Sequence, residues 1–350
     1  MTVPDVIDLM SDTVTRPTPA MREAMVTCDV GDDVFGKDPT VIELERMTAM
    51  MVGMEASLWC PTGTMANQVA IATHTHPGQE VIAGNWSHVV NYELGGIAWN
   101  SLCQLYPVSD EGGWLRPENV KPVIREETVH TPGTGLLCIE NTHNRRGGRI
   151  MPLETHKELC HLAHDRKVPV HLDGARIWNA SIASGIPVPE YTTDADSMMF
   201  CLSKGLASPA GSMLCGTREF IDRARRLRKR FGGGLRQAGV LAACGIVSLN
   251  EMIDRLAEDH ANAKELASKI LETEALEIDP ATVETNICIF TIPRGVSGTA
   301  IDFCNASEQE GLLLTYMGDN LVRMVTHCDY KSEWSDAAVE RTVKAVARIA

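Results

Sequence analysis

Two short stretches place an aspartate and a lysine directly after apolar runs. Residues 168–177 read Val-Pro-Val-His-Leu-Asp-Gly-Ala-Arg-Ile, and residues 196–205 read Asp-Ser-Met-Met-Phe-Cys-Leu-Ser-Lys-Gly. An apolar run of about four to eight residues with polar or glycine neighbours is typical of a buried strand in a parallel sheet, and ligands of such sheets bind beyond the carboxyl ends of the strands. The sequence therefore predicts that Asp173 and Lys204 serve one site.

These two residue types match the needs of a particular cofactor. A lysine amine can form a Schiff base with a carbonyl group, and an aspartate can pair with a ring nitrogen, which is what pyridoxal 5'-phosphate requires to act as an electron sink. Each residue alone also fits a simpler role, because Asp173 can cap a turn before Gly174 and Lys204 can extend its ammonium group from a strand end into water. The prediction depends on the two together.

Two further segments fit the same site. Thr62, Gly63 and Thr64 precede a stretch with helical periodicity, and exposed N–H groups at a helix N-terminus can hold a phosphate, although an ordinary helix cap has the same sequence pattern. His88 follows the expected strand at residues 80–83, so its flat imidazole is expected at the same sheet edge, where it can stack on a pyridine ring. A lone histidine in a loop is more often a surface residue, so neither segment is specific by itself.

Two arginines are candidates for binding the carboxylate of an amino acid. Arg176 lies three residues after Asp173, and Arg323 lies inside the apolar stretch Leu-Val-Arg-Met-Val. A guanidinium group binds a carboxylate through two parallel hydrogen bonds. A structural ion pair is an equally good explanation of either arginine from the residues alone.

The elements that must position these residues alternate along the chain, because short apolar runs follow stretches of helical periodicity. This alternation predicts an α/β doubly wound sheet in the middle of the chain, followed by a smaller α+β part. The expected helices are 40–53, 65–74, 153–166, 218–230, 235–256, 260–271 and one from 335 onwards. The expected strands are 80–83, 135–139, 169–172, 197–202, 212–215, 286–292, 311–315 and 321–326.

Composition excludes several other classes of protein. The formal net charge of -14 disfavours binding to nucleic acids or anionic membranes, whose surfaces repel it. Eleven scattered cysteines without a C-x-x-C pair do not form a disulfide framework, and we expect neither a secretion signal nor a spanning helix. We therefore expect a small-molecule enzyme of the cytoplasm. Cys160, His161 and His164 share helical spacing, but without a further ligand they do not complete a metal site, so no metal is predicted.

Taken together, the sequence resembles the low-specificity threonine aldolases of the β-eliminating lyase group, which are fold-type-I pyridoxal-phosphate enzymes. The resemblance covers almost the whole chain in ordered blocks. These blocks are residues 8–17 (DLMSDTVTRP), 30–40 (VGDDVFGKDPT), 61–67 (PTGTMAN), 139–144 (IENTHN), 171–177 (HLDGARI), 201–205 (CLSKG), 232–239 (GGGLRQAG) and 323–327 (RMVTH).

The resemblance implies a role for each candidate residue. Lys204 would carry the cofactor as a Schiff base, Asp173 would pair with the pyridine nitrogen, and His88 would stack on the ring. Arg236 would reach the phosphate from a neighbouring subunit. The residues expected to bind the cofactor are Thr62, Gly63, Thr64, His88, Asp173, Arg176, Lys204 and Arg236. The residues expected to bind the substrate are Ser11, Tyr92, His143, Arg176 and Arg323.

The implied reaction is the retro-aldol cleavage of L-threonine or L-allo-threonine to glycine and an aldehyde. His88, His143 or a water molecule that they orient would take the proton of the β-hydroxyl group, and the sequence does not choose among them. Amino-acid racemisation or β-elimination on the same scaffold is the alternative, and a non-catalytic cofactor-binding protein is a more distant one. The chain departs from the common pattern at Met10, Phe35 and Asn91, and Phe35 has no hydroxyl group to offer.

The same resemblance implies the organisation of the whole molecule. Residues 1–17 would form an N-terminal arm that contributes to the active site. Residues 18–245 would form a large cofactor-binding domain, and residues 246–350 a small C-terminal domain. Members of the family are usually homotetramers, built as dimers of dimers with shared active sites, so we expect an oligomer.

Overall fold

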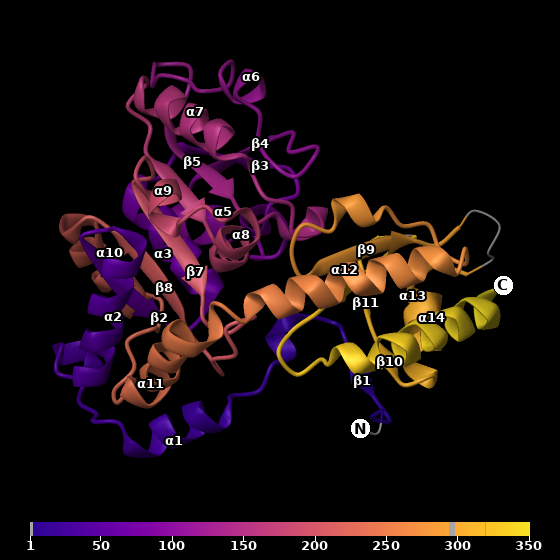
Figure 1. The fold of residues 1–350 in the computed structure, drawn as a ribbon. Coiled ribbons are helices and arrows are strands. Elements are labelled where there is room, and N and C mark those ends of the chain that lie inside the picture. The colour runs from indigo at the N-terminus through magenta and orange to yellow at the C-terminus, as the bar shows by residue number, and fades with distance from the viewer. Residues whose placement is uncertain (1–2, 294–297, 319) are drawn as a thin grey trace.

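The computed structural model describes residues 3–293, 298–318 and 320–350. It has two units (Figure 1), of which the larger is built on a seven-stranded sheet and the smaller on a three-stranded sheet. The long helix α12 (Leu256–Glu272) runs from the larger unit along the smaller one. The predicted α/β sheet with a smaller α+β part is confirmed.

The sheet of the larger unit has the strand order β2-β8-β7-β6-β5-β3-β4. Strand β8 runs antiparallel to both of its neighbours, and the other neighbouring strands pair in parallel. The strands are β2 (Ala56–Cys60), β3 (Glu80–Gly84), β4 (Gln104–Val108), β5 (Thr134–Glu140), β6 (Val170–Asp173), β7 (Ser197–Cys201) and β8 (Ser212–Gly216).

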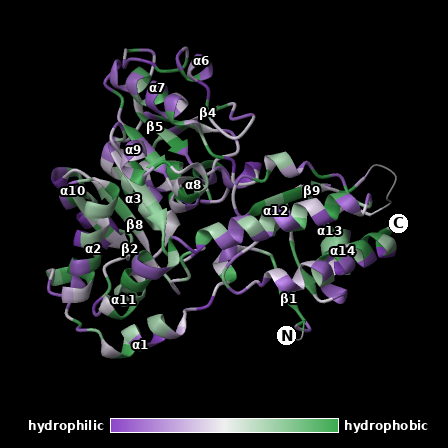
Figure 2. Ribbon diagram, in the orientation of Figure 1, coloured by the Kyte–Doolittle hydropathy of each residue, from purple (hydrophilic) through white to green (hydrophobic). Residues whose placement is uncertain are grey.

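The central strands are apolar because helices cover both faces of the sheet. Every residue of β3, β5, β6, β7 and β8 is buried, and the sheet appears predominantly green in Figure 2. Strands that are buried on both faces read as continuous apolar runs rather than as an alternating pattern. The edge strand β4 lacks such a run, since Gln104 and Pro107 are exposed, and it was not among the expected strands.

Helices with clear end signals surround this sheet. For example, α2 begins after Asp38, whose side chain accepts hydrogen bonds from the amides of Thr40 and Val41, and it ends at Gly53 with φ 70°. The helices of the larger unit are α1 (Pro19–Thr27), α2 (Pro39–Val52), α3 (Gly63–His74), α4 (His88–Asn91), α5 (Gly96–Ser101), α6 (Pro117–Val120), α7 (Leu153–His164), α8 (Ile177–Ser184), α9 (Val188–Thr192), α10 (Arg218–Arg230) and α11 (Gly239–Val247).

The smaller unit combines the C-terminal part of the chain with its first residues. Strands β9 (Ile287–Thr291), β12 (Leu321–Val325) and β11 (Thr315–Tyr316) form an antiparallel sheet, and β1 (Ile7–Asp8) pairs in parallel with β10 (Leu312–Leu313). Helices α13 (Ala300–Gln309) and α14 (Ser335–Ile349) pack in the same unit. Because Ile7 and Leu9 are buried in this core, the start of the chain is anchored to its C-terminal part.

Two predicted elements are wrong. The expected strand at 311–315 is split between two sheets, because β10 pairs with β1 and β11 pairs with β12. The expected helix at 235–256 is two helices, because α11 ends at Val247, a π-helical turn occupies residues 248–252, and α12 begins at Leu256. Leu249 and Met252 remain buried through the interruption, so the apolar pattern continues where the helical hydrogen bonding changes.

The boundary predicted near residue 246 stays a prediction. The core of the larger unit includes residues up to Leu256, and the second core begins with Ala263, so the two cores separate within α12. The first two residues of the predicted N-terminal arm lie outside the described residues. Within the described ranges, no helix is both long and apolar enough to span a membrane.

Candidate active site

Three predicted functional side chains, together with Asn144, which was not predicted, follow the carboxyl ends of four neighbouring parallel strands. His88 comes after β3, Asn144 after β5, Asp173 ends β6, and Lys204 comes after β7. The strand register pairs Glu140 with Asp173 and Asp173 with Met199, so these strand ends are nearly level. This alignment brings residues that are far apart in sequence to one edge of the sheet.

A cavity of about 220 Å³ opens at this edge, and both units contribute to its walls. Several predicted site residues line it, together with three residues of the smaller unit that the sequence did not single out. Its lining residues are Ser11, Thr13, His88, Tyr92, Asn144, Arg176, Lys204, Thr315, Tyr316, Met317 and Arg323.

Lys204 lies in a tight turn between β7 and β8, and its backbone is held from two sides. Its carbonyl oxygen accepts hydrogen bonds from Oγ1 of Thr15, at 3.1 Å, and from the amide of Ala207, at 2.8 Å. Thr15 belongs to the N-terminal segment, so that segment fixes the lysine backbone at the cavity. The partly exposed side chain remains accessible to a carbonyl compound.

Asp173 is a buried carboxylate whose orientation is set by two donors. It is 2% exposed, and it accepts hydrogen bonds from Nδ2 of Asn67, at 2.9 Å, and from the amide of Ala175, at 3.1 Å. Among the described residues, no lysine or arginine lies within ion-pair distance of it. A protonated ring nitrogen would supply the positive charge that a buried carboxylate requires.

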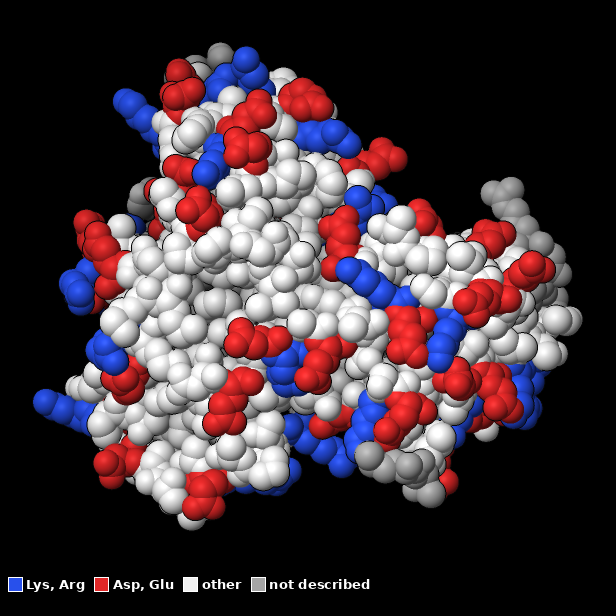
Figure 3. All heavy atoms as spheres, in the orientation of Figure 1, with Lys and Arg blue, Asp and Glu red and all other residues white. Residues whose placement is uncertain are grey.

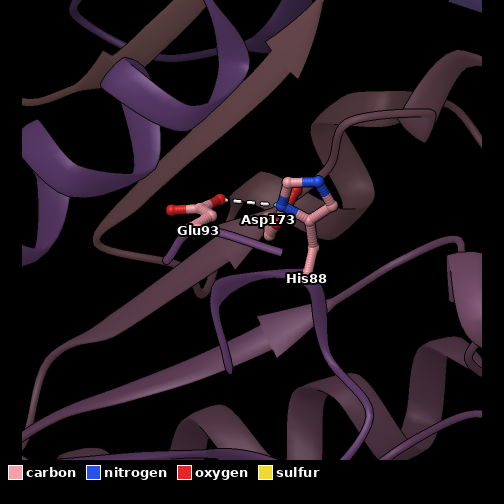
Figure 4. A group of neighbouring side chains, drawn as sticks. All are labelled: His88, Glu93 and Asp173. Atoms are coloured by element: carbon pink, nitrogen blue, oxygen red, sulfur yellow. Dashed lines mark hydrogen bonds and ion pairs between the residues drawn. The ribbon is translucent and has the colours of Figure 1, made fainter. Parts of the chain in front are cut away.

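Glu93 is a functional candidate that the sequence analysis missed. Figure 4 shows His88, Glu93 and Asp173 grouped together, with His88 Nδ1 2.8 Å from Glu93 Oε1. Glu93 is buried and also accepts hydrogen bonds from Asn67 Nδ2, at 2.8 Å, and Gln68 Nε2, at 2.6 Å. The spacing of five residues after His88 was the available signal, but a glutamate in a predicted loop has no distinctive pattern.

Glu93 and Asp173 control the charge of His88. Burial is the largest influence and by itself lowers the pKa of His88, but the hydrogen bond to Glu93 and the negative charge of Asp173 outweigh it, so the pKa is raised above 6.5. The ligand atoms of His88, Glu93 and Asp173 lie within 4.8 Å of one another, but protein donors already bind both carboxylates. Glu93 therefore orients the imidazole through a hydrogen bond, and Asp173 acts on it through its charge.

The predicted phosphate segment forms the first turn of α3. Thr62 caps this helix by accepting a hydrogen bond from the amide of Met65 at 3.1 Å, and the amides of the first turn have no acceptor within the helix. Gly63 packs closely against the sheet, since a Cβ atom there would lie 2.8 Å from Sγ of Cys201. Thr64 is exposed beside it. This N-terminus can hold an anion through backbone amides and hydroxyl groups.

The two predicted carboxylate-binding arginines have different surroundings. Arg176 is 5% exposed, and its Nε and Nη2 atoms each donate to a carboxylate oxygen of Asp12 at 2.7 Å. Its remaining group, Nη1, donates to Asn144 Oδ1 at 3.2 Å. Burial raises the pKa of Asp12, but the charge and hydrogen bonds of Arg176 outweigh it and hold this pKa well below its usual range. Most of the guanidinium group of Arg176 is therefore already occupied.

Arg323 lines the same cavity without a carboxylate partner among the described residues. Its Nη1 donates to Asn144 Oδ1 at 2.9 Å, its Nη2 donates to the carbonyl oxygen of Met10 at 3.2 Å, and its Nε has no hydrogen-bond partner. Burial and the repulsion from Arg176 lower the pKa of Arg323 to about 10. An anion bound in the cavity would relieve both effects.

The other predicted residues are spread around the cavity. Ser11 and Tyr92 line it, and the Tyr92 ring lies 5.5 Å from the His88 ring. His143 is not among the lining residues: it is 1% exposed, and its Nε2 lies 2.9 Å from Asp110 Oδ2. Arg236 is exposed between α10 and α11, where its Nη1 donates to Asp32 Oδ2 at 3.1 Å.

Two of the positions that depart from the common pattern contribute little to the cavity through their side chains. Met10 offers its carbonyl oxygen to Arg323, whereas Asn91 donates to the carbonyl oxygens of Asn85 and Ser87 within its own loop. Phe35 is 72% exposed.

The residues present fit pyridoxal 5'-phosphate. A lysine at the cavity, an unpaired buried aspartate, an imidazole beside that aspartate and a helix N-terminus with a close-packed glycine are the groups that its aldehyde, ring nitrogen, ring face and phosphate need. Lys204, Asp173 and His88 lie at one edge of the sheet, where the sequence analysis expected them.

Comparisons with known proteins agree with this description. Residues 8–292 match the model of the beta-eliminating lyase family. The chain is 41% identical to low-specificity L-threonine aldolase 1 of Arabidopsis thaliana, covering 92% of this chain and 91% of that protein. It is also 41% identical to the low specificity L-threonine aldolase of Escherichia coli, covering 93% and 95%. The solved structure of Leishmania major threonine aldolase has the same fold, with a TM-score of 0.82 at 16% identity over 97% of this chain and 99% of that one.

Proposed function

The chain belongs to the beta-eliminating lyase family, and on this premise we propose that the protein cleaves L-threonine or L-allo-threonine to glycine and acetaldehyde with the help of pyridoxal 5'-phosphate. The chain has the fold of threonine aldolase, as expected for a fold-type-I pyridoxal-phosphate enzyme. The observation that carries the proposal is the cavity in which Arg323, without a carboxylate partner among the described residues, stands with Lys204 and His88.

The cofactor would be attached through Lys204 and held by residues of three strand ends and one helix. When bound, pyridoxal 5'-phosphate withdraws electrons from the Cα atom of an amino acid. Asp173 would keep its ring nitrogen protonated, His88 would lie against its ring, and the first turn of α3, from Thr62 to Thr64, would hold its phosphate. The orientation of Asp173 by Asn67 and Ala175 supports this arrangement.

Arg323 would take the substrate carboxylate, with Ser11 and the Nη1 atom of Arg176 beside it. Asn144 accepts hydrogen bonds from both arginines, so it keeps the two guanidinium groups in a fixed relation. Fixing the carboxylate would determine which bond at Cα breaks, and positioning of this kind supplies much of the rate acceleration. Retro-aldol cleavage requires that this bond be Cα–Cβ.

His88 is the best-placed base for the β-hydroxyl proton. It lines the cavity, and its Nδ1 atom is engaged by Glu93, which leaves Nε2 to accept a proton. His143 would need a water molecule to act, because it is almost fully buried and does not line the cavity. Tyr92, beside His88, would contact the substrate side chain.

We further propose a homotetramer, built as a dimer of dimers in which Arg236 of a neighbouring subunit completes each phosphate site. The exposed position of Arg236 supports this, because its side chain is 58% exposed. The cytoplasm is the proposed compartment, since all eleven cysteines are free thiols, which persist in reducing surroundings.

The deciding experiment supplies L-threonine, L-allo-threonine and their D-enantiomers separately to the cofactor-loaded enzyme. We expect glycine and acetaldehyde in equal amounts from at least one L-isomer. Conversion of L-threonine to D-allo-threonine without acetaldehyde would favour the racemase, and 2-oxobutanoate with ammonia would favour elimination. No reaction of any isomer would contradict the proposal.

A further inference from the structure

Arg145 lies near the cavity without being one of its lining residues, and no role has yet been assigned to it. It follows Asn144, which lines the cavity, and its Cζ atom lies 5.2 Å from the ring centroid of Trp86. A Cβ atom on Gly318 would lie 3.5 Å from its Nη2 atom. Gly318 follows Met317, another lining residue. The guanidinium group therefore lies near both Trp86 and Gly318.

The positive charge of Arg145 is not neutralised by the described residues. None of their carboxylates lies within ion-pair distance of it, and its guanidinium group donates no hydrogen bond to them. The carboxylates on the neighbouring strands are engaged elsewhere: Glu140 accepts from the amides of His88 and Asn144, and Asp110 pairs with His143. Packing on the Trp86 ring holds the guanidinium group while leaving its N–H donors free.

The charge of Arg145 also acts on the cavity itself. Burial, then Arg176, then Arg145 each contribute to lowering the pKa of Arg323. Arg176 is paired with Asp12, whereas Arg323 and Arg145 have no carboxylate partner among the described residues. One carboxylate satisfies Arg323, and the free N–H groups of Arg145 can bind a second anion.

We propose that Arg145 forms an anion subsite for the substrate side chain and that the enzyme accepts β-hydroxy-α-amino acids with a carboxylate on Cβ, namely β-hydroxyaspartate. This inference rests on the proposed function, in which Arg323 binds the α-carboxylate. In the reaction, the Cα–Cβ bond breaks, the β-hydroxyl group loses its proton and becomes an aldehyde carbonyl, and Cα gains a proton. The products are glycine and glyoxylate, and no oxidant or reductant is consumed.

The test compares β-hydroxyaspartate with β-hydroxyasparagine, which has nearly the same shape and no side-chain charge. We expect kcat/KM to favour the charged substrate, and we expect Arg145→Gln to reduce this preference about tenfold, as befits the loss of one charge-assisted hydrogen-bonded contact. Arg46→Gln is the matched control, because Arg46 is an exposed arginine on α2 that pairs with Glu43 outside the cavity. This control should leave the preference unchanged.

A binding measurement separates this inference from the proposed reaction. L-Aspartate and L-asparagine lack the β-hydroxyl group, so calorimetry on the cofactor-loaded enzyme reports recognition of the charge without cleavage. Aspartate should bind more tightly, and added salt should weaken its advantage because Arg145 is partly exposed to solvent. Charge-selective binding without threonine cleavage would refute the proposed function alone. Threonine cleavage with no preference for either charged ligand, or a preference that Arg145→Gln leaves intact, would overturn the subsite.

Discussion

The pair His88 and Glu93 shows how one buried carboxylate can set the state of a residue at the cavity. Glu93 accepts three side-chain hydrogen bonds. One of them comes from Nδ1 of His88, which therefore carries a proton. The other imidazole nitrogen then remains for the substrate. A buried carboxylate that is hydrogen-bonded to an imidazole in this way orients the ring and raises its basicity.

Replacing Glu93 by glutamine tests this relation directly. We expect Glu93→Gln to lower the pKa of His88, because burial continues to disfavour the imidazolium ion while the negative charge of Glu93 is lost. Histidine NMR titration of the cofactor-free protein measures the shift without any need for turnover. Asp110→Asn is the matched control, since it removes the partner of His143 and should leave the His88 titration in place.

The same shift has a consequence for stability. Because the pKa of His88 is raised in the folded protein, its protonation stabilises the fold below pH 6.5, and this contribution is lost as the pH rises through the folded-state pKa. The decrease in the free energy of unfolding with rising pH should be smaller in Glu93→Gln. An unchanged His88 titration in that variant would show that Asp173 alone raises the pKa.

At the scale of elements, the strand ends were the predictable part of the site. Strands β5, β6 and β7 are continuous apolar runs that stop at a polar or glycine residue, so Asp173 and Lys204 could be placed at one sheet edge from the sequence. The partner of Arg176 could not be found in the same way. Asp12 is separated from Arg176 by 164 residues and belongs to the N-terminal segment, which carries no strand pattern strong enough to place it.

The break between α11 and α12 shows a second limit of the sequence. A periodic pattern of apolar residues predicts which side of a helix is buried. Leu249 stays buried where the backbone becomes π-helical, so the pattern does not reveal the change. Hydrogen-bond geometry along the backbone has no such signature. The family resemblance supplied the roles of His143 and Arg236, and the contacts within one chain leave those roles as predictions.

The Asp12–Arg176 ion pair connects the N-terminal segment to the start of α8, and breaking it should destabilise the protein. Both side chains are almost fully buried, so Asp12→Asn leaves a buried cation without its counter-charge, which costs about 3–5 kcal/mol. Urea unfolding of the cofactor-free protein at fixed protein concentration measures this loss. Glu43→Gln, which breaks the exposed Glu43–Arg46 pair, is the control and should change the free energy of unfolding little.

The pH dependence of unfolding gives this prediction a second readout. The folded-state pKa of Asp12 is lowered below its ordinary value of 3.8, so its stabilising contribution is fully present above that pH and is lost as the pH falls through the folded-state pKa. The difference between the wild-type protein and Asp12→Asn should therefore shrink in strong acid. A constant difference at every pH would contradict a role for the charge.

At the scale of the whole molecule, apolar side chains exposed around α5 favour association. Leu94, Trp99 and Leu102 are 98%, 85% and 64% exposed within nine residues of chain. Charged side chains are scattered over the face seen in Figure 3, which also has a wide area of the larger unit without them. Exposed apolar clusters of this kind mark protein interfaces. The proposed oligomer would cover these side chains with a second copy of the chain.

Shared active sites can be tested by combining two defective subunits. Lys204→Ala removes the proposed cofactor attachment, and Arg236→Gln removes the proposed phosphate contact, so each variant alone should have little activity. In a mixed dimer, one site would combine the native Lys204 of one subunit with the native Arg236 of the other. Random assembly from equal co-expression should therefore restore about a quarter of the wild-type sites.

A phosphate site formed within a single subunit would give the opposite result. If Arg236 served the phosphate of its own subunit, the mixed dimer would contain one site without Lys204 and one without Arg236, and co-expression would restore nothing. The control combines Lys204→Ala with Asp173→Ala, since both residues lie at the same sheet edge of one chain and should not complement each other. Recovery by the first pair and none by the second would place Arg236 across the interface, because only an interface lets two subunits with different defects rebuild one complete site.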